Sequence, residues 1–243
     1  MEFDALKVKN NLVRWIQDWF EQNGKNCNAV LGISGGKDST IVAALCAQAL
    51  GKERVTGVLL PNGIQSDIDI SKSVIKHFGI ASLEINIEEA YDSIISKVNK
   101  YAEPSLQTRV NLAPRLRMSI LYAVSQTING RVANTSNLSE AWIGYSTRYG
   151  DSAGDFAPLL NLTVTECKAV GYALNIPAEF IEKIPHDGIS GQTDEEKIGF
   201  TYDVLDKYIR TGICENKEIK NKIDTMHAGN KFKTLPMPSF EWR

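Results

Sequence analysis

Residues 31–40, with the sequence LGISGGKDST, combine glycines, hydroxyls and a carboxylate in the pattern of a phosphate-binding loop. An apolar strand is expected before the loop at Ala29–Ile33, and an Ala/Val/Leu-rich helix after it at Ser39–Leu50. The first N–H groups of a helix lack partners within the helix, and the helix dipole favours negative charge there, so an anion should bind. Asp38 would repel a bare phosphate but suits one that arrives with Mg²⁺. The segment therefore predicts a site for a magnesium nucleotide.

This segment is not the P-loop of nucleotide hydrolases, G-x-x-x-x-G-K-[ST]. Lys37 follows a glycine, but the earlier glycine is missing and Asp38 stands where Ser or Thr is required. Reaction at the γ-phosphate is therefore disfavoured. The simplest alternative is an ordinary Gly-Ser turn between a strand and a helix. The expected strand before the turn and the expected helix after it favour the phosphate site.

A second polar segment, residues 134–155, is dense in hydroxyls and carboxylates for a surface loop. Glu140 in this segment is a candidate to bind Mg²⁺ opposite Asp38, because Mg²⁺ in proteins usually takes one or two carboxylates together with phosphates and waters. Composition alone favours a solvated polar loop, so the interpretation depends on the spacing within the segment. The residues concerned are Thr135, Ser136, Glu140, Thr147, Asp151 and Asp155.

Strand and helix patterns alternate along the chain, which is typical of a parallel sheet built from βαβ units. Such a sheet carries helices on both faces, so we expect an α/β fold with three α/β/α layers. Ligands of these folds bind beyond the carboxyl ends of the strands, here in the loops at 34–39, 61–66 and 134–137. The expected strands are Ala29–Ile33, Val55–Leu60, Ser82–Ile87 and Arg131–Ala133, and the expected helices lie near 3–22, 39–50, 67–78, 90–100, 111–129, 163–175, 194–209 and 216–227.

Length and composition indicate one globular domain over residues 1–243. The chain has 43% hydrophobic and 23% charged residues, which is ordinary for a globular protein. Its formal net charge of −2 predicts no surface for nucleic acid. With no apolar run of about 18 residues and no basic N-terminal segment followed by an apolar one, we expect no membrane association and a cytoplasmic location. The four cysteines form no C-x-x-C pair and are expected to be reduced thiols.

Five segments spread along the chain resemble the ammonia-dependent NAD⁺ synthetase family, a member of the N-type ATP pyrophosphatase superfamily. The first segment contains the pyrophosphate-loop pattern S-G-G-x-D-S, and the fourth contains the synthetase-specific pattern E-x-x-x-G-x-x-T-x-x-G-D. The segments are LGISGGKDST at 31–40, LPNGIQSD at 60–67, NLAPRLRM at 111–118, TSNLSEAWIGYSTRYGD at 135–151 and HDGISGQTDEEKIGFTYDVLDKYI at 186–209.

The resemblance implies a Rossmann-like fold of the adenine nucleotide alpha hydrolase type. It also implies an ATP- and Mg²⁺-dependent amidation of deamido-NAD⁺ (nicotinic acid adenine dinucleotide) with ammonia, the last step of NAD biosynthesis. A carboxylate resists ammonia because its leaving group would be oxide. Adenylation of the nicotinate oxygen removes this obstacle, because pyrophosphate leaves into the loop at 34–39 and ammonia then displaces AMP from the acyl-adenylate. Mg²⁺ and preorganised N–H donors would meet the charge on the departing pyrophosphate.

The same resemblance implies roles for individual residues. Asp38 and Glu140 would bind Mg²⁺, and together with Asp151 they are the expected catalytic residues. Asp151, Arg115 and Lys231 would bind the dinucleotide. The residues expected to bind ATP are Gly32, Ile33, Ser34, Gly35, Gly36, Lys37, Asp38, Ser39, Gln65 and Thr135, and the lid over the ATP site would include His186, Asp187, Gly188 and Ser190.

A homodimer is expected from surplus apolar surface. The helix at 3–22 carries Trp15 and Trp19 beside its regular apolar positions, and the helix at 111–129 has a second broad apolar face. The family places its dinucleotide site across a two-fold interface. Ammonia is expected as the nitrogen donor, free or from a partner glutaminase, because Cys27 directly precedes the first strand and leaves no room for a glutaminase domain.

Three positions depart from the family pattern. Val164 stands where a lysine that reaches the nucleotide phosphates is usual, Asn134 where glycine is usual, and His186 where a small hydroxyl residue is usual. Lys37 is a candidate to restore the missing positive charge, with a solvated loop lysine as an equal alternative. Two functional alternatives stay open: another amide- or thiol-forming ATP pyrophosphatase, and a nucleotide-binding homologue with reduced activity.

Overall fold

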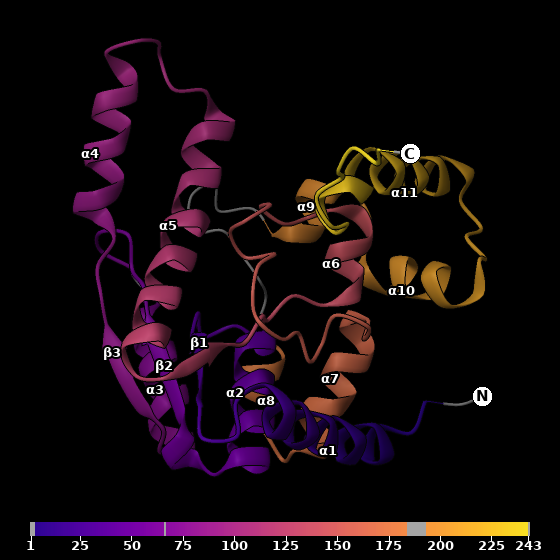
Figure 1. The fold of residues 1–243 in the computed structure, drawn as a ribbon. Coiled ribbons are helices and arrows are strands. Elements are labelled where there is room, and N and C mark those ends of the chain that lie inside the picture. Colours follow the sequence, from indigo (N-terminus) through magenta and orange to yellow (C-terminus); the bar gives the residue numbers. More distant parts are fainter. Residues whose placement is uncertain (1–2, 66, 184–192, 243) are drawn as a thin grey trace.

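The computed structural model describes residues 3–65, 67–183 and 193–242, and its centre is a sheet of four parallel strands (Figure 1). The strands are β1 (Asn28–Gly32), β2 (Val55–Leu59), β3 (Ala81–Glu84) and β4 (Gly130–Val132), in the order β3-β2-β1-β4. Helices cover both faces of the sheet, so the predicted three-layer α/β fold is confirmed. The predicted lid residues His186, Asp187, Gly188 and Ser190 lie outside the described residues.

Helices connect the strands and continue after the last one. The helices α4 and α5 form a hairpin that projects beyond the sheet (Figure 1). Two short 3-10 turns are η1 (Lys52–Arg54) and η2 (Lys231–Lys233). The helices are α1 (Ala5–Asn23), α2 (Lys37–Leu50), α3 (Ile68–Phe78), α4 (Glu88–Asn99), α5 (Leu106–Thr127), α6 (Leu138–Ile143), α7 (Val164–Ala173), α8 (Ala178–Ile181), α9 (Asp194–Ile198), α10 (Tyr202–Thr211) and α11 (Lys217–Asn230).

The alternating side chains of β1 separate two apolar cores, because successive residues of a strand point to opposite faces of the sheet. Ala29 and Leu31 pack in a core shared with α1, α2 and α7. Val30 packs in a second core, which α5 covers with Met118 and Leu121. The apolar face that the sequence analysis singled out within 111–129 is therefore packed against the sheet over 118–128, so this stretch does not supply the surplus apolar surface expected for a dimer.

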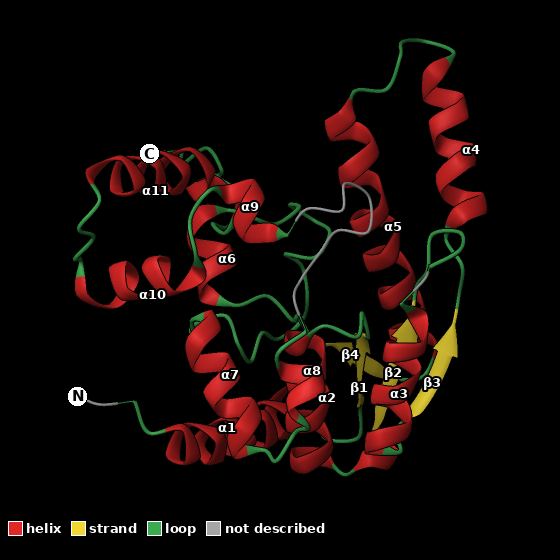
Figure 2. Cartoon of the chain, turned by 180° about the vertical axis from the view of Figure 1, so that it is seen from behind, coloured by secondary structure: helices red, strands yellow, loops and turns green. Residues whose placement is uncertain are grey.

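The C-terminal helices form a third apolar cluster beside the sheet (Figure 2). The buried carboxylate of Asp206 on α10 joins this cluster to α6 and α7. It accepts hydrogen bonds from the hydroxyl of Ser139 and, at 2.8 Å each, from the backbone N–H and the hydroxyl of Thr165. The Ser139 hydroxyl in turn accepts the N–H of Val164 at 3.0 Å. This network fixes the position of α6, which the sequence analysis did not predict.

Two expected elements differ from the prediction. The helix expected over 194–209 is divided into α9 and α10, because Gly199 ends α9 in the left-handed region with φ of +78° and Thr201 caps the next helix. The strand expected over Ser82–Ile87 stops at Glu84, because Ile87 already forms the N-cap of α4.

The order of the strands locates a crevice. The chain adds β2 and β3 on one side of β1 and then returns to place β4 on the other side. In an open parallel sheet, ligands bind beyond the carboxyl ends of the strands at such a switch point. The segments that follow β1 and β4 are the two polar segments singled out from the sequence.

Exposed apolar side chains gather on α1 and on the α4–α5 hairpin. On α1, Ile16 and Phe20 are buried whereas Trp15 is 42% exposed. Within the described part of the chain, no helix combines the length and the apolar character that crossing a membrane requires. The cysteines are free thiols, as expected, and Cys27, Cys46 and Cys167 are buried. The exposed apolar residues of the hairpin are Ile94, Val98, Tyr101, Leu106 and Val110.

Candidate active site

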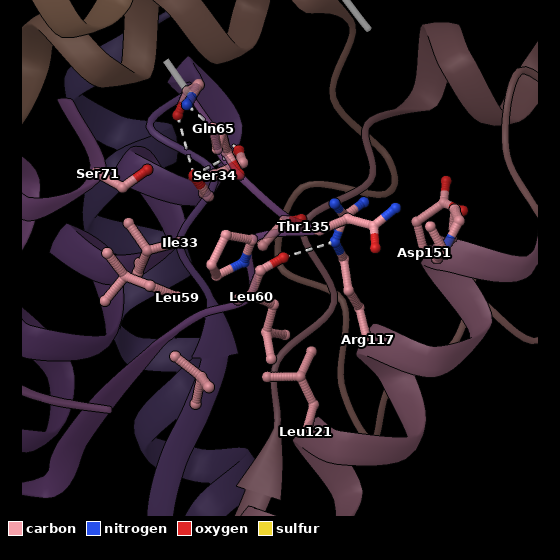
Figure 3. A pocket seen from close by; sticks show the side chains of 18 of the residues that line it. Ile33, Ser34, Leu59, Leu60, Gln65, Ser71, Arg117, Leu121, Thr135 and Asp151 are labelled. Carbon is pink, nitrogen blue, oxygen red and sulfur yellow. Dashed lines mark hydrogen bonds between the residues drawn. The ribbon is translucent and has the colours of Figure 1, made fainter. Parts of the chain in front are cut away.

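A cavity of about 690 Å³ opens at the carboxyl ends of β1, β2 and β4 (Figure 3). Arg117 of α5 lies between Thr135 and Asp151 in this view, and its Nε donates to the carbonyl of Leu60 at 3.0 Å. The structure thus brings together most of the site residues predicted from sequence. Those that line the cavity are Gly32, Ile33, Ser34, Gly36, Lys37, Asp38, Ser39, Gln65, Thr135, Glu140 and Asp151, whereas Gly35, Arg115 and Lys231 are not among its lining residues.

The loop after β1 presents backbone N–H groups to this cavity. Gly36 is the N-cap of α2, so the helix starts at Lys37, two residues earlier than expected. Gly35 has φ of +75°, and a Cβ at this position would lie 3.0 Å from the Oγ and 3.1 Å from the N of Ser71. Only glycine fits this approach to α3. The Oγ atoms of Ser34 and Ser39 lie 3.3 Å apart, so hydroxyls and N–H groups converge at one end of the helix.

Asn137 holds the two predicted metal ligands together. As the N-cap of α6, its Oδ1 accepts the backbone N–H of Glu140 at 3.1 Å, and its Nδ2 donates to Oδ2 of Asp38 at 3.3 Å. Asn137 is fully buried. The sequence analysis missed this residue, although an Asn three residues before a Glu is a recognisable helix start.

Lys37 lies inside the site and is not a solvated loop lysine. Its side chain is 4% exposed, and its Nζ donates to Oδ2 of Asp38 at 2.8 Å. Burial disfavours the charged ammonium, but attraction to Asp38 and Glu140 outweighs burial and raises the pKa of Lys37 above its usual range. Lys37 therefore contributes one positive charge between two carboxylates.

The carboxylates of Asp38 and Glu140 fit a divalent cation. Burial, followed by repulsion from Asp38, raises the pKa of Glu140 to about 8, although Lys37 and Asn137 lower it. The Oδ1 atom of Asp38 is buried and finds no hydrogen-bond partner among the described residues. Two interacting carboxylates, one of which has a buried oxygen without a partner among the described residues, are suitable ligands for Mg²⁺, which takes its remaining ligands from phosphates and water.

The pKa of Glu140 predicts a pH-dependent stability. A raised pKa in the folded protein means that the stability contributed by protonated Glu140 is complete below the ordinary value of 4.5 and is lost as the pH rises through about 8. The substitution Glu140→Gln should therefore flatten the decline in thermal stability between about pH 5 and pH 8, measured without added metal. The exposed Glu179→Gln serves as the control. Parallel profiles for wild type and Glu140→Gln would contradict this assignment.

Asp151 faces the cavity from a loop that Asn134 braces. Its Oδ1 accepts the N–H of Thr147 at 2.9 Å. Desolvation by the surrounding protein raises the pKa of Asp151, although the residue is exposed at the surface of the cavity. The Nδ2 of Asn134 donates to the carbonyls of Asp151 and Ala153 at 2.7 and 2.8 Å. Asn134, which replaces the usual glycine, therefore ties the Asp151 loop to the end of β4.

The cations near Asp151 differ from those favoured by sequence. Arg117 and Lys233 both interact electrostatically with Asp151, and the Nζ of Lys233 donates to the carbonyl of Gly144 at 2.7 Å. Arg115 is exposed and donates to the carbonyl of residue 148 at 3.2 Å, and Lys231 is exposed in η2. Lys233 gave no signal in the sequence because it lies in a tail without a motif.

Val164 packs in the third apolar cluster, with 5% of its surface exposed. This burial favours a packing role over a missing phosphate-binding cation. We expect Val164→Lys to lower the free energy of unfolding by roughly 1–3 kcal/mol without raising turnover, because lysine would bury an unpaired charge. Chemical unfolding and steady-state rates test this, with Val98→Lys on the exposed side of α4 as the control. A faster variant of wild-type stability would refute it.

The fold and the site define an ATP-dependent enzyme of the nucleotide α-hydrolase type, and comparison specifies the family. The NAD synthase family model matches residues 8–235, so the chain belongs to this family. The chain is 41% identical over 209 residues to an NH₃-dependent NAD⁺ synthetase of Thermococcus sibiricus, covering 85% of this chain and 80% of the relative. It is 35% identical to one of Finegoldia magna, covering 97% and 96% of the two chains. The resemblance inferred from the sequence is confirmed.

Two solved structures share the fold over nearly the whole chain. An NMN synthetase from Francisella tularensis matches with a TM-score of 0.91 at 29% identity, covering 99% of this chain and 100% of the other. An NH₃-dependent NAD synthetase from Campylobacter jejuni matches over the same shares and at the same identity with a TM-score of 0.80. Both matches support the three-layer fold described above.

Proposed function

We propose that this protein amidates the nicotinate carboxylate of deamido-NAD⁺ with ammonia, with ATP as co-substrate and Mg²⁺ as cofactor, and releases NAD⁺, AMP and pyrophosphate. The observation that carries this proposal is the meeting of Asp38 and Glu140 beside the N-terminus of α2, at one end of a cavity of about 690 Å³. Family membership supports the same reaction over those of other ATP pyrophosphatases.

In the first step, adenylation of the nicotinate carboxylate, the residues of the chain would act by binding and orienting the reactants. The N–H groups at the start of α2 and the hydroxyls of Ser34 and Ser39 would bind the departing pyrophosphate. Asp38 and Glu140 would hold Mg²⁺, which supplies positive charge to the phosphates when bound. The nicotinate oxygen can then attack the α-phosphorus, and the acyl-adenylate forms as pyrophosphate leaves.

The second step needs ammonia at the activated carbonyl carbon. Asp151 and Arg117 face the cavity close to Thr135 (Figure 3). The nitrogen of ammonia would attack the carbonyl carbon, and the carboxylate of Asp151 would take one proton from that nitrogen. The Arg117 guanidinium would orient the anionic substrate. AMP then leaves and the amide remains. The predicted roles of Arg115 and Lys231 in binding the dinucleotide belong to this proposal as well.

Nicotinate mononucleotide is a second candidate substrate, because its amide is NMN. The observation that favours it is the higher TM-score with the NMN synthetase, 0.91 against 0.80 at equal sequence identity. The two substrates share the nicotinate ribose phosphate and differ in the adenylyl half, so the chemistry of the cavity is the same for both.

Release of AMP with each substrate tests the proposal. The purified protein is given ATP, Mg²⁺ and ammonium with deamido-NAD⁺ or nicotinate mononucleotide, and kcat/KM is measured for each. A higher value for deamido-NAD⁺ supports the first candidate, and a higher value for the mononucleotide supports the second. Absence of AMP with both substrates would contradict the amidation itself.

We also propose that the protein acts as a cytoplasmic homodimer and that residues 1–243 form one domain. Exposed Trp15 on α1 and the apolar side chains of the α4–α5 hairpin support the dimer. Sedimentation velocity at micromolar concentration tests it, and a mass of 26.9 kDa, that of one chain, would contradict it.

A further inference from the structure

Lys37 and the divalent cation would share one carboxylate, that of Asp38. The Lys37 ammonium donates to Oδ2 of Asp38 at 2.8 Å, and the Asn137 amide donates to the same oxygen at 3.3 Å. The other oxygen, Oδ1, is the buried one without a partner in the described part of the chain. Metal coordination by Asp38 would therefore place two cations, the Lys37 ammonium and the metal, at one carboxylate.

The net charge around Asp38 determines whether Lys37 and the divalent cation can both be bound there. The Lys37 ammonium, whose side chain is 4% exposed, already balances the charge of the Asp38 carboxylate. A divalent cation alone would turn this into a net positive charge, which burial penalises. A nucleotide triphosphate brings several negative charges with the metal, and these offset the positive charges of Lys37 and the metal.

The reach of Lys37 allows this exchange of partners. Lys37 and Asp38 are the first two residues of α2, and the phosphate-facing N–H groups lie at the same helix end. Lysine carries its charge on a flexible chain of four methylenes with three rotatable donors. Lys37 lines the cavity together with Ser34 and Ser39, so its ammonium can turn from Asp38 to a phosphate oxygen with a small movement.

We propose that Lys37 is a positioning residue that excludes the divalent cation until the nucleotide arrives, and then moves from Asp38 to the phosphates. Metal and nucleotide consequently bind with positive coupling, and the metal alone binds poorly. This inference rests on the proposed use of a magnesium nucleotide. It concerns binding alone and requires no turnover.

Direct metal binding tests the proposal. Mn²⁺ is titrated into the protein alone and in the presence of α,β-methylene ATP, with Mn²⁺ followed by electron paramagnetic resonance. For wild type, we expect the analogue to tighten Mn²⁺ binding by about tenfold or more. For Lys37→Met, we expect Mn²⁺ alone to bind about tenfold tighter than to wild type, and the analogue to bind more weakly. Lys72→Met is the matched control, because Lys72 pairs with Glu84 on the surface at 3.0 Å.

Each result bears on the proposal. Equal Mn²⁺ affinity of wild type with and without the analogue would overturn it, and this measurement needs no variant. Mn²⁺ binding by Lys37→Met that is no tighter than wild type would overturn it as well. Where Lys37→Met does not fold, Lys37→Gln keeps a hydrogen-bond donor and carries the same expectation. Intact coupling without amidation of either nucleotide would contradict the proposed function alone.

Discussion

Replacing Asp38 with Asn should reduce AMP formation by roughly 10²–10³-fold or more while the protein stays folded. Asn keeps the shape of the side chain but removes the charge that would bind Mg²⁺ beside the departing pyrophosphate. Because Glu140 remains as a partner for the Lys37 ammonium, the fold should tolerate the change. Steady-state AMP release at saturating ATP and Mg²⁺ measures the effect.

The matched control for this variant is Asp69→Asn. Asp69 is the second residue of α3, as Asp38 is the second residue of α2, and it is exposed outside the cavity. Both substitutions remove one negative charge from the first turn of a helix, so a general effect on the helix dipole would appear in both. Near-normal activity of Asp38→Asn at saturating Mg²⁺ would eliminate Asp38 as a metal ligand.

The second large effect is expected at Asp206. The substitution Asp206→Ala should lower the free energy of unfolding by about 1–3 kcal/mol, because it leaves the buried Ser139 hydroxyl without its acceptor and removes two hydrogen bonds from Thr165. Urea unfolding measures this loss. Activity should fall as well, because the network holds α6 and with it Glu140.

Asp203→Ala is the control on the same helix. Asp203 is exposed in the first turn of α10, and substitutions at such surface positions usually change stability by no more than about 0.5 kcal/mol. If Asp206→Ala unfolds at the same urea concentration as Asp203→Ala, the buried network contributes nothing and α6 is held by apolar packing alone.

The sheet and its site loops could be predicted because local patterns encode them. The apolar runs around Val30 and Val58 give strands, and the Gly-rich turn before α2 gives the phosphate loop. The family pattern E-x-x-x-G-x-x-T-x-x-G-D identified Glu140 and Asp151 as further site residues, and both line the cavity. Each of these signals lies within a short stretch of the sequence, so it can be recognised without a structure.

The parts that sequence reasoning missed depend on contacts between distant segments. Asn137 connects α6 to Asp38 across 99 positions of the chain, and Asp206 connects α10 to α6 across 67. The burial of Lys37 follows from the two carboxylates around it, of which Glu140 comes from far along the chain. The single helix expected over 194–209 failed because Gly199 was not read as a helix end, although its φ of +78° makes it one.

The position of the two carboxylates relative to the apolar clusters has a consequence for cooperativity. Asp38 belongs to α2, which packs in the core of the sheet, whereas Glu140 belongs to α6, whose Ile143 packs with the C-terminal helices. A cation held by both would add a cross-link between two apolar clusters that α7 already connects. Local opening of the C-terminal helices would then cost more free energy, and amide exchange in α10 and α11 would slow when metal and nucleotide are added.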